Sequence, residues 1–333
     1  MKPPITVVGM GLAGACTAWQ LWRRGVPFRV VDSGRLGSSH VAAGLIHAVT
    51  GKQCAVAEDF AQRREEAERF YRACEQDLRQ AIWHPLEVIR LLRPAEAEKK
   101  LKKFVSGPAA AWVEQITQWE RWPEDVAVIL RGGARLDVPM FLQETREFFQ
   151  AHGCYEQREL KAAVAGEKMI FCEGAQGLLR GHPVAWRHRC ARGEILTVRA
   201  PAWQQRRMVT GRGWLVPVGP DVYKVGATYA WDEFQRGPTA EGLETLRNIA
   251  AELGGEDYEI IAHDAGVRPI LRQSQPVAGP VAPGLYVFNG LGSKGSLYAP
   301  WAAERLVRSI IDGDPLESAL SVAEYFAKLP PSA

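Results

Sequence analysis

Three glycines near the start of the chain have the spacing of a phosphate-binding turn. Gly9, Gly11 and Gly14 form a G-x-G-x-x-G run between a β-rich segment, 5–8, and a segment rich in helix formers, 15–24. In such a turn the first glycine permits the tight bend, the second lets the backbone approach a pyrophosphate, and the third lets helix and strand pack closely. The amides and the dipole at the start of the helix attract the phosphate charge.

Asp32 completes this pattern at the end of a second β-rich segment, 28–31. It lies 18 residues after Gly14, where an acidic side chain accepts hydrogen bonds from the hydroxyls of a ribose. An acid here, in place of an arginine, argues against a 2′-phosphate. The β-α-β unit therefore predicts a site for NAD or FAD, and it leaves the choice between the two open.

The cysteines and histidines predict no metal site. The six cysteines contain no C-x-x-C pair, and none lies beside a histidine at an interval typical of zinc ligands. Scattered cysteines of this kind are usually buried thiols in a reducing compartment. We therefore expect neither a metal nor a disulfide framework.

The composition is that of a soluble globular enzyme. Of 333 residues, 47% are hydrophobic and 24% are charged, which excludes a disordered chain and a disulfide-rich miniprotein. The 41 basic and 38 acidic residues leave a formal charge of +3, too small for a general nucleic-acid coat. The uncharged run 5–22 superficially resembles a signal segment, but its glycines and its direct continuation into a second strand argue against one. We expect no membrane span and a cytoplasmic location.

Two patterns describe the elements that must position these residues. Helices and strands alternate at both ends of the chain, and the middle of the chain has the pattern of antiparallel strands. A charged stretch, 96–103, is interpreted as the solvated face of a helix in preference to a nucleic-acid patch. Further helices are expected at 58–82, 139–152, 241–253 and 300–311, and further strands at 154–157, 168–172, 194–198, 214–218, 223–228 and 285–288.

The segment after Asp32 distinguishes the two cofactors. A loop of small residues, 33–45, stands where an NAD dehydrogenase would continue into further β-α repeats. Here the chain resembles the FAD-dependent amine and amino-acid oxidoreductases of the D-amino-acid oxidase superfamily, which includes glycine oxidase, sarcosine oxidase and the oxidase domain of the bifunctional tRNA wobble-uridine modification enzyme. Ordered motifs extend the resemblance over nearly the whole chain, at 168–177, 192–196, 215–217, 225–228, 266–269 and 290–297.

The resemblance and the element pattern together predict an α/β fold with two interleaved domains. The first is a Rossmann-like FAD-binding domain, which we expect to be discontinuous and to comprise 1–84, 138–205 and 264–333. The second is an antiparallel-sheet (α+β) substrate domain comprising 85–137 and 206–263.

The resemblance implies FAD as the cofactor, bound without a covalent bond. Relatives that attach flavin through a histidine carry it where this chain has Val41, and the last loop contains no cysteine. With Gly9, Gly11 and Gly14, the residues implied to bind FAD are Leu12 and Ala13 at the pyrophosphate, Asp32 and Ser33 at the ribose, Ser38, Ser39, Ala43, Gly44 and Leu45 at the phosphates and ring, Leu160 at the adenine, Gly174 in a glycine turn, and Leu291, Gly292, Ser293, Lys294, Gly295, Ser296 and Leu297 around the flavin's pyrimidine edge.

Lys294 has two interpretations. A reduced flavin carries negative charge near N1 and the C2 carbonyl, where a glycine loop that opens a helix directs amides and a dipole. Lys294 then adds a full positive charge to that edge, or it is a solvated loop lysine. Both interpretations stay open.

The activity implied by the family is oxidation of a C–N bond, with hydride passing from the carbon to flavin N5, so no nucleophile or metal is required. Arg268 is the implied anchor of a substrate carboxylate, with a structural tie to a neighbouring acid as the alternative. Trp214 and Tyr229 are expected to form an aromatic wall, with ordinary core packing as the alternative. Glycine oxidase has a tyrosine in place of Trp214 and an arginine in place of Ser293, so a larger or flatter secondary amine is favoured over glycine. No catalytic residue is assigned.

Two other functions remain in view. One is an FAD-dependent step of tRNA wobble-base modification, which requires a basic funnel, and its candidate residues are Lys99, Lys100, Lys102, Lys103, Arg187, Arg189 and Arg192. The other is a non-catalytic nucleotide-binding protein. The expected partner is a small amine or amino acid, and the sequence contains no signature of the electron acceptor or the oligomeric state.

Overall fold

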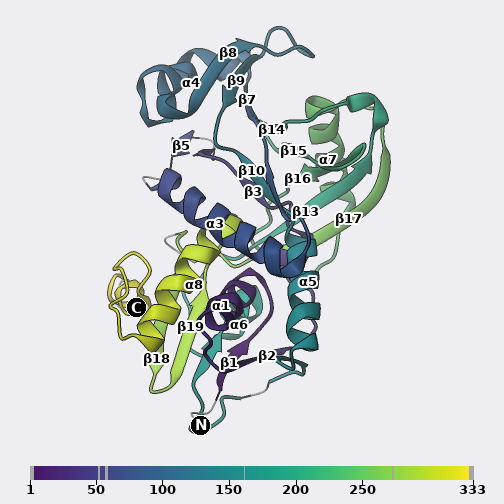
Figure 1. Cartoon of the computed structure of the whole chain (residues 1–333). Helices are drawn as coiled ribbons and strands as arrows, with labels where there is room; N and C mark the ends of the chain where they lie inside the picture. Colours follow the sequence, from purple (N-terminus) through teal and green to yellow (C-terminus); the bar gives the residue numbers. More distant parts are fainter. Residues whose placement is uncertain (1–3, 52, 57–58, 161, 272–273, 330–333) are drawn as a thin grey trace.

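Two β-sheets organise the chain, one in each half of the molecule in Figure 1. The structure is a computed structural model and describes residues 4–329, except 52, 57–58, 161 and 272–273. The first sheet has six strands in the order β11 (Tyr155–Gln157), β2 (Phe28–Asp32), β1 (Ile5–Val8), β12 (Met169–Phe171), β19 (Leu285–Asn289) and β18 (Val277–Ala282).

The six-stranded sheet is parallel except at its edge, where β18 pairs antiparallel with β19. Its strands are short apolar runs whose side chains alternate between two buried faces. Val7 and Ile170 lie in one core cluster, while Val8, Met169 and Phe171 lie in another. Strand β2 follows β1 in the chain and pairs with one edge of β1, whereas β12 pairs with its other edge. The strand order therefore reverses at β1, which makes β1 a topological switch point. Ligands of such sheets bind outside the carboxyl ends of the strands at this point.

Helices cover both faces of this sheet. On the face that Figure 1 shows in front, α1 (Leu12–Arg23) contacts α8 (Gly295–Ile311) and α5 (Val138–Ala151), and α3 (Phe60–Leu78) crosses between the two sheets. On the other face, α6 (Gly174–Arg180) and α9 (Val322–Ala327) contribute Leu178, Val322 and Tyr325 to the second core cluster.

The second sheet has eight strands and is antiparallel apart from the β14–β7 pair. Its helix α7 (Ala240–Leu253) packs on β13, β15 and β16 and closes a third core cluster. The strands in order are β17 (Glu259–Arg268), β13 (Ala191–Arg199), β16 (Val222–Gly226), β15 (Trp214–Gly219), β14 (Met208–Thr210), β7 (Val88–Leu92), β9 (Val126–Leu130) and β8 (Val113–Gln118).

Shorter elements connect the two sheets. Strand β10 (Ala134–Leu136) pairs with β3 (Leu45–Ile46) and β6 (Trp83–Pro85), and β4 (Val49–Thr50) pairs with β5 (Ala55–Val56). The remaining helical segments are α2 (Ser38–Val41), α4 (Pro94–Ser106) and two 3₁₀ turns at Pro108–Trp112 and Pro201–Trp203.

The predicted fold class is confirmed, and three predicted helix boundaries were wrong. The first helix begins at Leu12, directly after the glycine turn, rather than at 15. The helix expected at 58–82 ends at Leu78, because Arg79 takes a left-handed conformation with φ of 57°. Residue 58 lies outside the described residues. Glu75 accepts hydrogen bonds from the Ile82 and Trp83 amides. Residues 79–82 therefore form a separate turn that folds back toward the end of the helix.

The last long helix begins at Gly295 rather than at 300, and it includes Pro300. A proline usually marks the first turn of a helix because it lacks an amide proton. Here Leu297 and Tyr298 are buried before the proline is reached, and their packing stabilises the extra turn. The helix therefore starts inside the glycine loop.

The division of the chain into two domains stays a prediction. Two strands bear on its boundaries. Strand β13 lies within 138–205, assigned to the FAD-binding part, yet it pairs with β16 and β17 in the eight-stranded sheet. Strand β17 crosses the boundary at 263–264.

Candidate functional site

A cavity of about 440 Å³ lies at the switch point of the six-stranded sheet and extends to the end of β17. Every predicted cofactor residue lines it except three, namely Gly14, Lys294 and Leu297. The predicted substrate residues Arg268, Trp214 and Tyr229 line it as well. Its lining comes from segments that include 8–13, 31–33, 35–45, 158–160, 172–176, 265–269, 289 and 291–293.

The glycine turn packs so closely that side chains are excluded from it. Gly9 has φ of +97°, and a Cβ there would lie 2.7 Å from the carbonyl oxygen of Cys172. A Cβ on Gly14 would lie 1.8 Å from the carbonyl oxygen of Gly9. Gly14 thus lets α1 pack against the turn, and Gly14 itself does not line the cavity. The start of α1 has no side-chain cap, and the Leu12 amide donates to Ser39 Oγ at 3.3 Å.

Asp32 connects this turn to the loop that follows β2. It is buried, and its Oδ1 accepts from the Met10 amide at 2.9 Å, while its Oδ2 accepts from the Gly34 amide at 2.9 Å. A carboxylate has about four acceptor sites, so two remain for hydroxyl groups in the cavity. The carboxylate therefore fixes the turn and still offers acceptors to a ribose.

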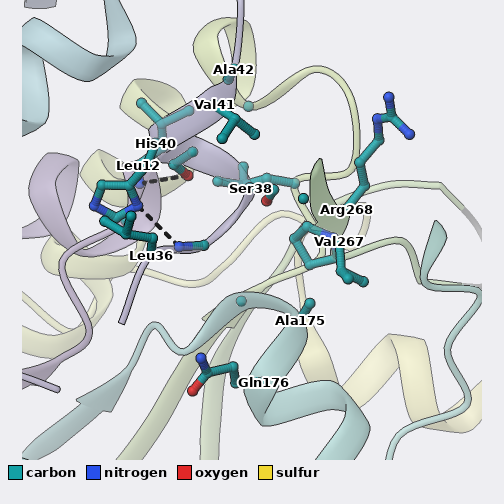
Figure 2. Close-up of a pocket in the computed structure, with 18 of the residues that line it drawn as sticks. Leu12, Leu36, Ser38, His40, Val41, Ala42, Ala175, Gln176, Val267 and Arg268 are labelled. Carbon is teal, nitrogen blue, oxygen red and sulfur yellow. Dashed lines mark hydrogen bonds between the residues drawn. The ribbon is translucent and has the colours of Figure 1, made fainter. Parts of the chain in front are cut away.

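The loop 38–45 is held between β10 and β17. A Cβ on Gly44 would lie 1.8 Å from the carbonyl oxygen of Leu136, and a Cβ on Gly266 would lie 3.0 Å from Ser38 Cα. Helix α2 therefore packs directly on β17. Figure 2 shows residues of α2 on one side of the cavity, Ala175 and Gln176 of α6 on another, and the Arg268 guanidinium group extended away from both.

Asn289 and Glu173 line the same cavity and were missed by the sequence analysis. Asn289 Nδ2 donates to the Gly174 carbonyl at 2.9 Å, and its Oδ1 accepts from the Gly290 amide at 2.8 Å. This side chain joins the last glycine loop to the start of α6. Glu173 Oε2 lies 2.5 Å from His182 Nδ1. Asn289 ends an apolar strand directly before a glycine, which was the available signal for this residue.

Arg268 has no carboxylate within ion-pair distance among the described residues. Its guanidinium carbon lies 4.2 Å from the centroid of the Tyr229 ring, and its Nη1 donates to the Thr228 carbonyl at 3.3 Å. A Cβ on Gly193 would lie 2.1 Å from Nη1, so that glycine makes room for the group. Burial lowers the pKa of Arg268, and Tyr229 opposes this shift. The alternative of a tie to a neighbouring acid finds no partner in the described part of the chain.

The two aromatic residues differ in their packing. Tyr229 is 54% exposed, so ordinary core packing does not describe it. Trp214 is partly buried against the main core, and its ring lies across Gly226, where a Cβ would be 2.4 Å from it. Both side chains line the cavity beside Arg268.

Residues 4–309 match the family model DAO, which is described as FAD dependent oxidoreductase. The chain belongs to this family. The predicted resemblance and the predicted cofactor, FAD, are thereby confirmed.

Individual relatives of this FAD-dependent oxidoreductase are distant. The chain is 24% identical over 334 residues to the tRNA 5-methylaminomethyl-2-thiouridine biosynthesis bifunctional protein MnmC of Idiomarina loihiensis. The aligned region covers 90% of this chain and 54% of that protein. The chain is 28% identical over 213 residues to glycine oxidase of Pseudomonas aeruginosa, covering 56% of this chain and 58% of that protein. The chain thus spans little more than half the length of each.

The fold is shared with solved oxidases. Glycine oxidase from Geobacillus kaustophilus superposes with a TM-score of 0.80 at 20% identity, covering 99% of this chain and 98% of that one. Iminodiacetate oxidase from Chelativorans sp. BNC1 gives a TM-score of 0.77 at 20% identity, covering 94% and 96% of the two chains.

The first cavity fits the FAD of this family. The uncapped start of α1, the two remaining acceptor sites of Asp32 and the side-chain-free turn at Gly9 are a donor and acceptor set for a dinucleotide. The assignment of individual residues to parts of FAD stays a proposal, as does its non-covalent attachment.

Lys294 and Leu297 line a neighbouring cavity of about 390 Å³. Lys294 is partly buried there, and burial lowers its pKa while Asp59 raises it. Lys294 thus lines this second cavity and not the first one, and both interpretations of its charge stay predictions.

The seven basic residues proposed for a funnel do not share one surface. Helix α4, which carries the four lysines, packs on β7 and β9 near one edge of the eight-stranded sheet, whereas Arg192 lies on β13 near the other edge. Arg192 is buried, and its Nη1 lies 2.7 Å from Glu194 Oε1. Arg192 is therefore engaged inside the protein.

Within the described residues, no three His, Cys, Asp or Glu side chains are grouped as metal ligands, and each of the six cysteines is free. Among the described residues, no helix is both long enough and apolar enough to cross a membrane.

Proposed function

We propose that this FAD-dependent oxidoreductase oxidises the C–N bond of a small amine or amino acid. The observation that carries the proposal is Arg268, a partly buried guanidinium group in the cavity without a carboxylate partner among the described residues. A planar guanidinium binds a carboxylate through two parallel hydrogen bonds, which sets the orientation as well as the position of a substrate.

When bound, FAD supplies the two-electron acceptor for hydride from the carbon that carries the nitrogen. The chain's own residues hold the substrate and set its protonation. Arg268 orients the carboxylate, and Trp214 with Tyr229 lines the same region with aromatic surface. A fixed positive charge lowers the pKa of a nearby ammonium group. Arg268 therefore also favours the neutral amine, the form that releases hydride.

The same proposal assigns the cofactor's contacts to separate elements. Asp32 and the start of α1 hold the adenosine and pyrophosphate side, and residues 291–293, which line the same cavity just before α8, hold the flavin side. The amides and the dipole at the start of α8 favour negative charge beside them.

An absorption spectrum of the purified protein, followed by anaerobic titration with a panel of amines, tests this function. We expect the two visible bands of bound flavin and their loss on addition of at least one primary or secondary amine carrying a carboxylate. A protein that takes up no FAD would indicate a non-catalytic nucleotide-binding role. A yellow protein that no amine of the panel bleaches would contradict the proposed activity.

A second candidate is a step of tRNA base modification, with the amine carried on a base. Tyr229 and Trp231 are each 54% exposed, their ring centroids lie 6.1 Å apart, and the Arg189 guanidinium lies 5.3 Å from the Trp231 ring. Exposed aromatic faces of this kind stack on bases. Binding of tRNA that persists at physiological ionic strength would favour this candidate, and absence of binding at low salt would remove it.

A further inference from the structure

The second cavity is lined by positively charged side chains that have no part in the proposed function. Its described lining includes Arg90, Arg212 and Lys294 together with His47 and Thr210, and it includes no aspartate or glutamate. Positive side chains around a cavity without acids raise the local concentration of anions there.

Arg90 is the most deeply placed of these cations. It is the one charged residue of β7, whose sequence is VIRLL, and it is only 7% exposed. Its Nη2 donates to the Gly51 carbonyl at 3.4 Å, and its buried Nε has no hydrogen-bond partner in the described structure. Burying a guanidinium group without a carboxylate is costly, and an anion in the cavity offsets this cost.

His47 and Lys294 line the same cavity as Arg90. Burial lowers the pKa of His47 to about 4, and the charges of Arg90 and Lys294 act in the same direction. His47 is thus neutral at pH 7 and available as a hydrogen-bonding group. Asp59, whose charge raises the pKa of Lys294, is already held by Arg63 Nε at 2.6 Å.

The second cavity adjoins the first. Leu45, Trp214, Tyr229 and Ser293 line both. Trp214 and Tyr229 therefore stand where the two cavities meet, with Arg268 lining the first cavity and Arg90 lining the second. The cations at the two ends come from different strands of the same sheet, β17 and β7.

We propose that the second cavity binds a second anionic group of the substrate, a carboxylate or a phosphate-like group, with Arg90 as the residue that determines this specificity. This inference rests on the proposed function of the first cavity. It narrows the substrate class to amines that carry two acidic groups.

Binding of inert anions tests the inference without any oxidation. The FAD-loaded protein is titrated calorimetrically with linear dicarboxylates from malonate to adipate and with the monocarboxylate of each chain length. We expect at least one dicarboxylate to bind about tenfold or more tightly than its monocarboxylate, because it gains charge-assisted hydrogen bonds at its second end. Replacing one carboxylate by a phosphonate distinguishes a carboxylate-preferring cavity from a phosphate-preferring one, and either preference supports the proposal.

Variants locate this preference. Arg90→Met removes the guanidinium and keeps an apolar side chain, so the ratio of dicarboxylate to monocarboxylate affinity should fall to near one. Arg90→Lys keeps a charge and should retain part of the ratio. Arg247→Met, on the exposed face of α7, is the matched control and should keep the full ratio.

The outcomes separate this inference from the proposed function. If no dicarboxylate of any length is preferred by the unmodified protein, the inference is wrong, whether or not Arg90→Met folds. A preference that survives in Arg90→Met would also overturn it. Amine oxidation without any preference for a second anion would contradict the inference alone, whereas a preference in a protein that bleaches with no amine would contradict the proposed function alone.

Discussion

Arg268 is placed so that its charge is available to a ligand. Its contacts are a tyrosine ring and one carbonyl, and the glycine at 193 makes room for the guanidinium group. Arg192, on the neighbouring strand, shows the contrast, because Glu194 and the Gly237 carbonyl already hold its guanidinium group. Among the described residues, Arg192 has an acid beside it and Arg268 has none, so only the charge of Arg268 stays available to a ligand.

Arg268→Lys should weaken binding of a carboxylate-bearing amine by about tenfold or more, because a lysine ammonium group cannot form the bidentate pair. The half-saturating concentration in anaerobic flavin bleaching measures this effect. The visible flavin spectrum should be retained, which separates lost binding from lost folding. Arg247→Lys is the control, and unchanged half-saturation in Arg268→Lys would refute the anchor role.

At the scale of elements, the junction of β1 and α1 is a close contact between backbones. The positive φ of Gly9 and the space required at Gly14 hold the start of α1 against the end of β12. The α1 amides are thereby directed into the cavity, and Asp32 fixes the turn from the next strand. The contact leaves no space for a methyl group.

Gly14→Ala should destabilise the protein by about 1–3 kcal/mol and weaken FAD binding, because the added Cβ must displace α1 from the Gly9 carbonyl. Urea unfolding of the apoprotein and fluorescence titration with FAD measure the two effects. Gly237→Ala is the control, since nothing lies within 4 Å of its added Cβ. Equal FAD affinity in both variants would show that the contact does not position α1.

At the scale of the whole molecule, Glu194 connects the strands of the eight-stranded sheet to α7. It is 1% exposed, and it accepts from Arg192, from the amide and hydroxyl of Thr239, and lies 2.8 Å from His263 Nε2. Burial raises the pKa of Glu194, but the hydrogen bonds from Thr239 and Arg192 outweigh it and leave the pKa below its ordinary value.

The depressed pKa sets a direction for pH dependence. Glu194 stabilises the folded state fully above its unfolded pKa, about 4.3, and this contribution is lost as pH falls through the lower folded value. Glu194→Gln should therefore lower the free energy of unfolding at pH 7, and the gap to the unmodified protein should narrow below pH 4. Urea unfolding at pH 7 and pH 3.5 checks this. A gap that stays constant with pH would contradict the ionised network.

The boundary of α8 shows where local patterns mislead. Pro300 predicts a helix start by itself, but burial of Leu297 and Tyr298 against distant parts of the chain extends the helix back to Gly295. In the same way, Arg192 is a candidate nucleic-acid contact by its charge, but the fold buries it beside Glu194. Short-range patterns report propensity and spacing, and they do not show how deeply the fold buries a side chain.

The sequence by itself determined the dinucleotide turn, its acid and the family, because the glycine spacing and Asp32 lie within one β-α-β unit, 5–32, whose geometry is local. Only the tertiary structure decided that Arg268 lacks an acid partner in the described part of the chain and that Arg90, His47 and Lys294 surround one cavity. Those residues come from segments far apart in the chain, and the pairing of strands in the eight-stranded sheet together with the packing of α8 brings them together.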